Sequence, residues 1–286
     1  MTLPWTVEAR SRNVTDVRVD MIGGGEQYFL LSSDRHHDNS HTDWDLELKH
    51  LSQAQERLAG VIDIGDMHCA MNGKYDRRQD RTSLREEYQM GNYLDRLVEV
   101  AGDFYAPFAR NFIVIGRGNH ETSILKHHET DLTERTCERI SQQADHRVLS
   151  GGYGGWVRFH FELTSTQVHR VCLKYFHGSG GGGPVTRGVI QTNRMSVFLP
   201  DAQIVATGHT HDQWLVPISR ERLASNGEVY LDEQVHVRCG TYKDEYGDGN
   251  GGWHIERGAP PKPIGAQWLR FYREGDRVRF DITRAK

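Results

Sequence analysis

Two short apolar runs joined by a helical pattern constrain the fold of this chain more than any other feature. Residues 27–32 and residues 61–64 each have the composition and length of a buried strand. The segment between them, 42–58, carries apolar residues at the spacing of one helix face: Trp44, Leu48, Leu51 and Leu58. A strand, a helix and a second strand in this order predict a parallel pair with a right-handed crossover. The chain is therefore expected to be an α/β protein.

The rest of the chain continues this alternation before it becomes rich in strands. Further strands are predicted at 14–21, 112–115, 156–163, 169–176 and 203–207, and further helices at 83–101, 130–143 and 185–198. A hairpin is predicted at 267–283, with its turn at 274–276. Because the sequence shows neither an internal repeat nor a linker, we expect a single domain over 1–286, with a β-rich part from about residue 213 onward.

Composition excludes several classes of protein. The 35 Lys and Arg against 39 Asp and Glu give a formal net charge of −4, which does not suit a general nucleic-acid-binding protein. The sequence has no stretch of about 18 apolar residues that would span a membrane, and its N-terminus lacks the apolar core of a secretory signal. The four cysteines are widely separated, which favours reduced thiols. These observations predict a cytoplasmic protein without a membrane partner.

Histidine is the unusual component, with 16 residues, and several of them follow the predicted strands. Five strand-like runs end in residues of the kind that bind metals: Asp34 and His36, Asp66, Asn119 and His120, His177, and His209 and His211. Sites in α/β sheets form at the carboxyl ends of strands, so these clusters are expected to converge. Asp, His and Asn donors suit Mn, Fe, Zn or Ni. Such a set predicts a two-metal hydrolase, with phosphate esters as its leading substrates.

The same residues, in the same order, resemble the calcineurin-like metallophosphoesterase superfamily. The matching segments are Asp34-Arg35-His36, Gly65-Asp66, Gly118-Asn119-His120-Glu121, His177 and Gly208-His209-Thr210-His211. The resemblance spans about residues 28 to 212. It implies a four-layer α/β/β/α sandwich, in which two mixed sheets are flanked by helices.

The resemblance also implies a role for each matching residue. Asp34, His36 and His211 correspond to ligands of a first divalent metal ion, and Asn119, His177 and His209 to ligands of a second. Asp66 corresponds to the carboxylate that bridges the two ions. His120 corresponds to a histidine that binds no metal, contacts the phosphate and protonates the leaving oxygen. Manganese is the expected metal, and a bridging hydroxide is the expected nucleophile.

One position departs from the family pattern. Cys69 stands three residues after Asp66, where many members have a second aspartate that orients the histidine corresponding to His120. Asp38 or Asp76 could take over that task.

The expected function is hydrolysis of P–O bonds, with a lean towards phosphodiesters in nucleotides or nucleic acid. This lean rests on the arginine-containing segment 74–81 and on the β-rich part after residue 213. The alternatives are a phosphomonoesterase acting on proteins or small molecules, a DNA-processing nuclease, and a non-catalytic metal-binding scaffold. The other histidines are expected to lie on the surface, to be paired locally or to sit beside the ligands; they include His68, His160, His169, His236 and His254.

Overall fold

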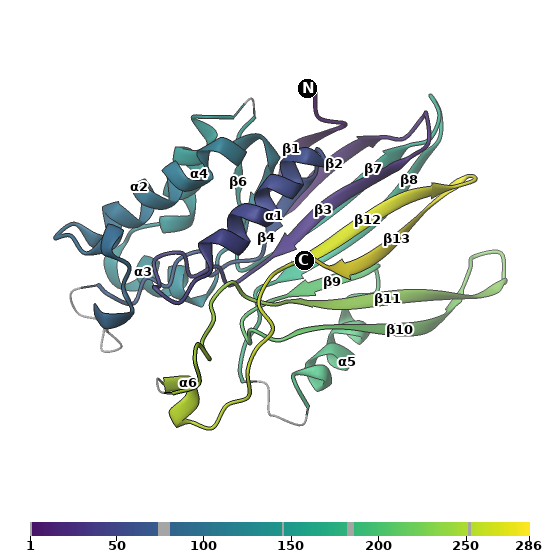
Figure 1. Ribbon diagram of the computed structural model, residues 1–286. Helices are drawn as coiled ribbons and strands as arrows, with labels where there is room; N and C mark the ends of the chain where they lie inside the picture. Colours follow the sequence, from purple (N-terminus) through teal and green to yellow (C-terminus); the bar gives the residue numbers. More distant parts are fainter. Residues whose placement is uncertain (1, 74–80, 145, 182–185, 251–252) are drawn as a thin grey trace.

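The computed structural model describes residues 2–73, 81–144, 146–181, 186–250 and 253–286 (Figure 1). Within these ranges the strands form two mixed sheets that pack face to face. The part of the chain after residue 213 contributes two strands to each sheet.

The first sheet has seven strands in the order β1-β2-β7-β8-β9-β11-β10. In that order its strands are β1 (Trp5–Ser11), β2 (Val14–Asp20), β7 (Gly154–Glu162), β8 (Val168–Phe176), β9 (Ile204–Thr207), β11 (Val229–Cys239) and β10 (Gln213–Leu223). The sheet is mixed: β2 with β7, β8 with β9 and β9 with β11 pair in parallel, and the other three pairs are antiparallel hairpins.

The second sheet has six strands in the order β13-β12-β3-β4-β5-β6. Its strands are β13 (Arg277–Arg284), β12 (Gln267–Glu274), β3 (Glu26–Ser32), β4 (Gly60–Asp63), β5 (Phe112–Ile115) and β6 (Leu149–Ser150). The strands β3 to β6 run parallel, as the strand–helix–strand pattern predicts, and β12 and β13 add an antiparallel edge. The three central parallel strands end close to one another and position the candidate site.

Apolar side chains fill the space between the two sheets. Phe159 of the first sheet lies between Phe29 and Phe271 of the second, with ring centroids 4.8 Å from each. All three rings are fully buried. This aromatic contact is part of the central core that fixes how the sheets stack.

Helices cover the outer faces of this sandwich. The helices are α1 (Trp44–Glu56), α2 (Tyr93–Tyr105), α3 (Asn119–His128), α4 (Leu132–Ser141), α5 (Val189–Phe198) and α6 (Trp253–Glu256), with short 3₁₀ turns at Arg81–Ser83, Glu86–Tyr88 and Ala106–Asn111. A second apolar core joins α1, α2 and α4 to the six-stranded sheet. Figure 1 shows α5 on the opposite side, beside the β9–β11 end of the other sheet. The predicted four-layer α/β/β/α architecture is confirmed.

The predicted helix at 83–101 starts too early. Instead of continuing a helix, Arg85 is extended, with φ −61° and ψ 148°. Its side chain donates hydrogen bonds to the carbonyl oxygens of Asn39 and Thr42, and its N–H donates to the Asp38 carbonyl. These contacts with a distant segment override the local helical pattern, and α2 begins only at Tyr93.

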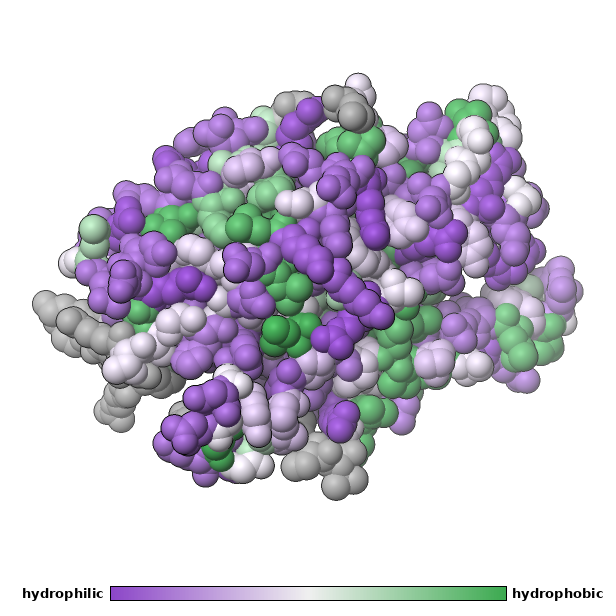
Figure 2. Space-filling view, in the orientation of Figure 1, coloured by the Kyte–Doolittle hydropathy of each residue, from purple (hydrophilic) through white to green (hydrophobic). Residues whose placement is uncertain are grey.

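The surface is mainly polar. Figure 2 shows apolar side chains gathered at the tip of the β10–β11 hairpin, where Leu223, Val229 and Leu231 are exposed. None of the helices in the described ranges has the length and apolar character needed to cross a membrane.

Candidate metal centre

The structure brings together all eight of the predicted site residues. Asp34 and His36 follow β3, Asp66 follows β4, Asn119 and His120 follow β5 and begin α3, His177 follows β8, and His209 and His211 lie between β9 and β10. Every one lies just beyond the carboxyl end of a strand, as expected for an α/β site. Three of the five segments belong to the six-stranded sheet and two to the seven-stranded sheet, so the candidate site straddles both.

The first donor group consists of Asp34, His36 and His211, whose ligand atoms lie within 4.8 Å of one another. The Nε2 atoms of His36 and His211 are 3.1 Å apart. They lie 3.8 Å and 3.4 Å, respectively, from Oδ1 of Asp34. The other oxygen of Asp34 accepts hydrogen bonds from the Ser33 hydroxyl at 2.6 Å and the His209 N–H at 2.8 Å, which leaves Oδ1 directed at the histidines.

The second donor group consists of Asp66, His177 and His209, joined by the amide oxygen of Asn119. His177 Nε2 lies 3.1 Å from Oδ2 of Asp66 and 3.2 Å from Oδ1 of Asn119. The same Asn119 oxygen is 2.6 Å from His209 Nδ1. The Ile64 carbonyl, 3.2 Å from His177 Nδ1, orients that ring so that Nε2 faces the group.

His120 lies between the two donor groups and is not a member of either. Its Nε2 is 3.7 Å from Oδ2 of Asp66, and its ring centroid is 5.0 Å from that of His36. Its Nδ1 is hydrogen-bonded to the backbone carbonyl of Cys69. With Nδ1 donating its proton to this carbonyl, Nε2 faces the space between the donor groups.

The Cys69 carbonyl therefore does what the missing aspartate was expected to do. Asp38 takes part at one remove, because its carboxylate accepts hydrogen bonds from the N–H groups of Cys69 and Ala70 and from the Tyr93 hydroxyl. Asp38 thereby fixes the loop in which the Cys69 carbonyl contacts His120. Asp76, the other candidate for this task, lies outside the described residues.

Glu121 is a site residue whose role the sequence did not indicate. Its buried carboxylate accepts hydrogen bonds from the N–H groups of Asp66, His68 and Gly118, at 3.2, 2.9 and 2.9 Å. Burial and the nearby Asp66 charge raise the pKa of Glu121 to about 8. Glu121 thus fixes the loop that carries Asp66 against the start of α3.

Glu245 is the second unpredicted residue. Its carboxylate lies 3.4 Å from Nδ1 of His211, on the side of the ring away from Asp34. It also pairs with Lys243 at 2.9 Å and with His254 at 3.1 Å. A carboxylate behind a metal-ligating histidine fixes the orientation of its ring. Glu245 lies in a Gly- and Asp-rich loop without a motif, so no local signal marks it.

The site is also where the backbone is most unusual. Asp34, His36, Asp66, His209 and His211 all have φ between 47° and 74°, in the left-handed region. Non-glycine residues pay a conformational cost there and persist only when the surrounding contacts enforce it. The left-handed turns aim these five side chains into the same space.

The carboxylates in the two donor groups favour positively charged partners, so the groups are suited to bind cations. Burial alone would lower the pKa of His177, but the carboxylates of Asp66 and Asp34 raise it to about 9. Burial alone would also lower the pKa of His211, but the nearby carboxylates of Asp34 and Glu245 raise it to about 9. Oδ1 of Asp34 and Nδ1 of His36 are buried without a hydrogen-bond partner in the described structure. Bound cations would replace these protons and satisfy Asp34.

A third cluster of potential ligands includes a thiol: His36, Cys69 and His120. Burial, followed by the Asp38 charge, raises the pKa of the Cys69 thiol far above its usual value. A thiol must lose its proton to bind a metal, so Cys69 is poorly suited as a ligand.

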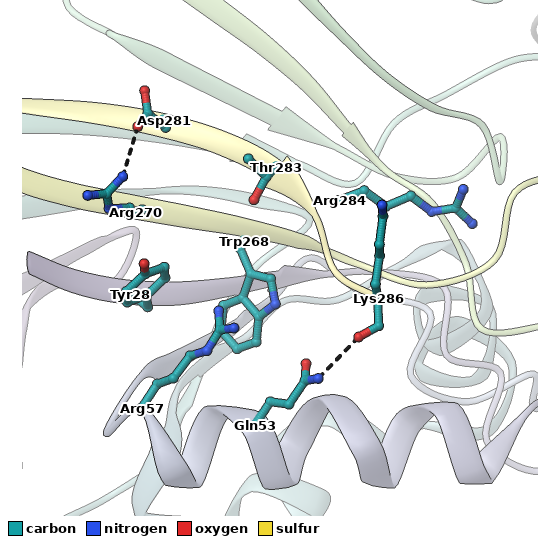
Figure 3. Close-up of a pocket in the computed structure, with 9 residues that line it drawn as sticks. All are labelled: Tyr28, Gln53, Arg57, Trp268, Arg270, Asp281, Thr283, Arg284 and Lys286. Carbon is teal, nitrogen blue, oxygen red and sulfur yellow. Dashed lines mark hydrogen bonds and ion pairs between the residues drawn. The ribbon is translucent and has the colours of Figure 1, made fainter.

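Two pockets differ in their relation to this site. One, of about 640 Å³, includes Asn119 in its lining. The other, of about 330 Å³, is formed by α1, β3, β12 and β13, and none of the predicted site residues lines it (Figure 3). Figure 3 shows Arg57 beside the Trp268 ring there, a packing contact at 4.5 Å from its centroid.

Several of the remaining histidines have other partners, as expected. His160 lies 3.3 Å from Asp16, His236 is hydrogen-bonded to Gln234 at 2.8 Å, and His68 to the Thr136 hydroxyl at 3.0 Å. His254 contacts Glu245, the residue behind His211, at 3.1 Å.

Comparison with known proteins gives weak overall similarities. No family model matches the chain, and no curated protein does. Among solved structures, vacuolar protein sorting 29 from Cryptosporidium parvum is 13% identical over 91% of this chain and 98% of that one, with a TM-score of 0.36. GAP50, the anchor in the inner membrane complex of Plasmodium, is 12% identical over 91% and 84%, with a TM-score of 0.44. A predicted phosphoesterase from Streptococcus pneumoniae is 11% identical over 91% and 90%, with a TM-score of 0.35. The function of this chain is therefore inferred from its own site residues.

Proposed function

We propose that the protein is a phosphoesterase that depends on two divalent metal ions and cleaves P–O bonds, preferentially in phosphodiesters of nucleotides or nucleic acid. The observation that carries this proposal is the pairing of two adjacent nitrogen–oxygen donor groups with a histidine placed between them. This arrangement supports the resemblance of the motifs to the calcineurin-like metallophosphoesterases.

In this proposal the two groups hold one ion each. Asp34, His36 and His211 hold the first, Asn119, His177 and His209 hold the second, and Asp66 lies between them. When bound, the ions would supply an activated water and positive charge that stabilises the phosphoryl oxygens. The donor set suits manganese, iron, zinc or nickel, and manganese is the first choice for loading.

His120 is the proposed proton donor. Its Nδ1 is occupied by the Cys69 carbonyl, which leaves Nε2 to contact the phosphate and to carry a proton to the leaving oxygen. Oδ2 of Asp66 lies 3.7 Å from this nitrogen, on the side of the donor groups. Asp38 and Glu121 keep both residues in place through backbone hydrogen bonds.

A paired assay tests the proposal. Metal-stripped protein is reloaded with Mn²⁺ and given p-nitrophenyl phosphate or bis-p-nitrophenyl phosphate, and bound metal is counted by elemental analysis. We expect two ions per chain and faster turnover of the diester. Asp66→Asn is expected to lose metal and turnover together, whereas His120→Ala is expected to keep both ions and lose about 10²–10⁴-fold in rate.

Each other outcome changes the proposal in a defined way. Preference for the monoester would leave a metal-dependent phosphoesterase but reverse the substrate preference. Two bound ions without turnover of either ester would favour a metal-binding scaffold. Unchanged turnover in His120→Ala would remove that residue from the mechanism.

A further inference from the structure

The cavity that contains Asn119 extends away from the candidate metal centre along one face of α3. Asn119, Thr122 and Lys126 line it at intervals of three and four residues, which places them on the same side of the helix. Tyr153 forms part of the lining from another segment, with its hydroxyl donating to the Gly178 carbonyl at 2.7 Å. One end of the cavity is therefore the candidate centre, and the other is the last turn of α3.

The charge of this cavity is entirely positive or neutral. Arg117, Lys126 and His127 line it, and none of its lining residues within the described structure is an aspartate or glutamate. Arg117 is already paired with Asp131. Lys126, by contrast, is exposed and has no carboxylate within ion-pair distance among the described residues. Its ammonium group is therefore available to an anion from outside the chain.

The distance along α3 relates the Lys126 charge to the candidate metal centre. Lys126 is the seventh residue after Asn119, which corresponds to about 10 Å along a helix axis. Helical side chains lean towards the N-terminus, so the Lys126 side chain leans back towards Asn119. A ligand that placed one phosphate at the donor groups would reach Lys126 with a second anionic group attached through a linker such as a sugar.

We propose that this cavity is a second-phosphate subsite, which binds an anionic group that the substrate carries beyond the ester to be hydrolysed. The inference rests on the proposed function and narrows its substrate class to esters with at least two phosphates, such as nucleoside bisphosphate esters and longer nucleotide chains. Simple esters with one phosphate leave Lys126 without a partner and bind more weakly.

Binding is measured first, because it does not depend on turnover. The Mn²⁺-loaded protein is titrated calorimetrically with thymidine 5′-monophosphate and with thymidine 3′,5′-bisphosphate, which differ only by the second phosphate. We expect the bisphosphate to bind roughly tenfold more tightly, the effect of one charge-assisted contact at a partly exposed site. Lys126→Ala is expected to abolish this difference, and Lys126→Glu to reverse it. Lys49→Ala, which removes an exposed lysine from α1 outside the cavity, is expected to retain it.

Kinetics then separate the subsite from the proposed activity. The substrates are the p-nitrophenyl ester of thymidine 5′-phosphate and the same ester bearing a 3′-phosphate. We expect a lower KM for the second ester, and a ratio of the two KM values that approaches one in Lys126→Ala. Added salt is expected to reduce the same ratio in the unmodified protein.

The outcomes distinguish the two proposals. Hydrolysis of both esters with equal KM values, unaffected by Lys126→Ala, would overturn the subsite and leave the hydrolase intact. Lys126-dependent binding of the bisphosphate without hydrolysis of either ester would support the subsite and overturn the proposed activity. Equal affinity for the two nucleotides would overturn the subsite whatever the turnover.

Discussion

The Glu245 carboxylate connects a candidate ligand to a loop that is remote in sequence. It lies behind His211 and is shared with Lys243 and His254. Because this contact is made by Nδ1 and leaves Nε2 facing Asp34, Glu245 acts as a positioning residue for His211.

Replacement of Glu245 by glutamine is therefore expected to weaken Mn²⁺ binding by about 10–100-fold. The change keeps the shape of the side chain but removes the charge that orients His211. Isothermal titration of metal-stripped protein measures the effect, and Glu228→Gln, an exposed glutamate on the β10–β11 hairpin, is the matched control. An unchanged affinity in Glu245→Gln would show that His211 is held by other contacts.

At this scale the sequence was informative only where the signal was local. The residues Asp34, Asp66 and His177 could be selected because each ends an apolar run. Glu245 could not, since its partner His211 lies in a different segment and the intervening chain fixes no spacing between them. At position 69 the sequence indicated only that the aspartate of the family pattern is absent. The group that contacts His120 in its place is the backbone carbonyl of Cys69, which a pattern of side chains does not reveal.

At the scale of elements, the site depends on two strand-to-helix loops that nearly touch. A Cβ on Gly118 would lie 1.9 Å from Oδ1 of Asp66 and 2.4 Å from its backbone nitrogen. Real atoms cannot approach so closely, and backbone has little freedom to move away. Glycine at 118 therefore permits the loops after β4 and β5 to meet.

Gly118→Ala is expected to separate these loops and to abolish metal binding, while the two sheets remain folded. Metal counted per chain and far-ultraviolet circular dichroism test the two parts of this expectation. Gly91→Ala provides the control, because a Cβ there would meet no atom within 4 Å. Normal metal content in Gly118→Ala would mean that the contact between the loops is dispensable.

Element type was predictable where periodicity was strong and unopposed. The buried strands β4 and β5 and the helix α1 match their predicted ranges closely. The helix α3 was missed because only Glu121 and Ile124 of its ten residues are buried, which leaves little apolar periodicity. The start of α2 was misjudged because Arg85 bonds to a segment more than forty residues away.

At the scale of the whole molecule, three buried histidines make stability depend on pH. Burial is the largest cause that lowers the pKa of His50, His68 and His236 to about 4. Their protons bind more readily in the unfolded chain, so the stability they contribute is present above pH 6.5 and is lost as the pH falls towards 4. The pKa values of His177 and His211 shift in the opposite direction, so the stability that these two residues contribute is present below pH 6.5 and is lost as the pH rises towards 9.

His50 offers a direct test, because it is fully buried on α1 and hydrogen-bonded to the Tyr242 hydroxyl at 3.0 Å. In metal-free buffer, the free energy of unfolding is expected to fall between pH 7.5 and pH 5, by about 2 kcal/mol for this residue alone. Urea titrations of the unmodified protein and of His50→Gln measure it. Equal pH dependence in the two proteins would contradict the assignment.

The layered architecture could be predicted from the alternation of strands and helices together with the motifs, but the order of strands could not. β12 pairs with β3 across more than two hundred residues, and β2 pairs with β7 across more than one hundred. Such pairings depend on which faces meet in the core, around residues such as Phe159, and no local pattern encodes them.

The position of the candidate site across both sheets has a mechanical consequence. The ions would be bound by residues that follow β3 and β4 in one sheet and by residues that follow β8 and β9 in the other. They would therefore cross-link the two sheets. Removal of the ions would leave the layers joined at this end by apolar packing and by hydrogen bonds such as that from the His209 N–H to Asp34. The force or temperature needed to separate the two sheets would then depend on the metal concentration, since a bound ion stabilises only the folded chain. Under the proposed function, the resistance of this protein to unfolding by force or heat would depend on the concentration of metal ions around it.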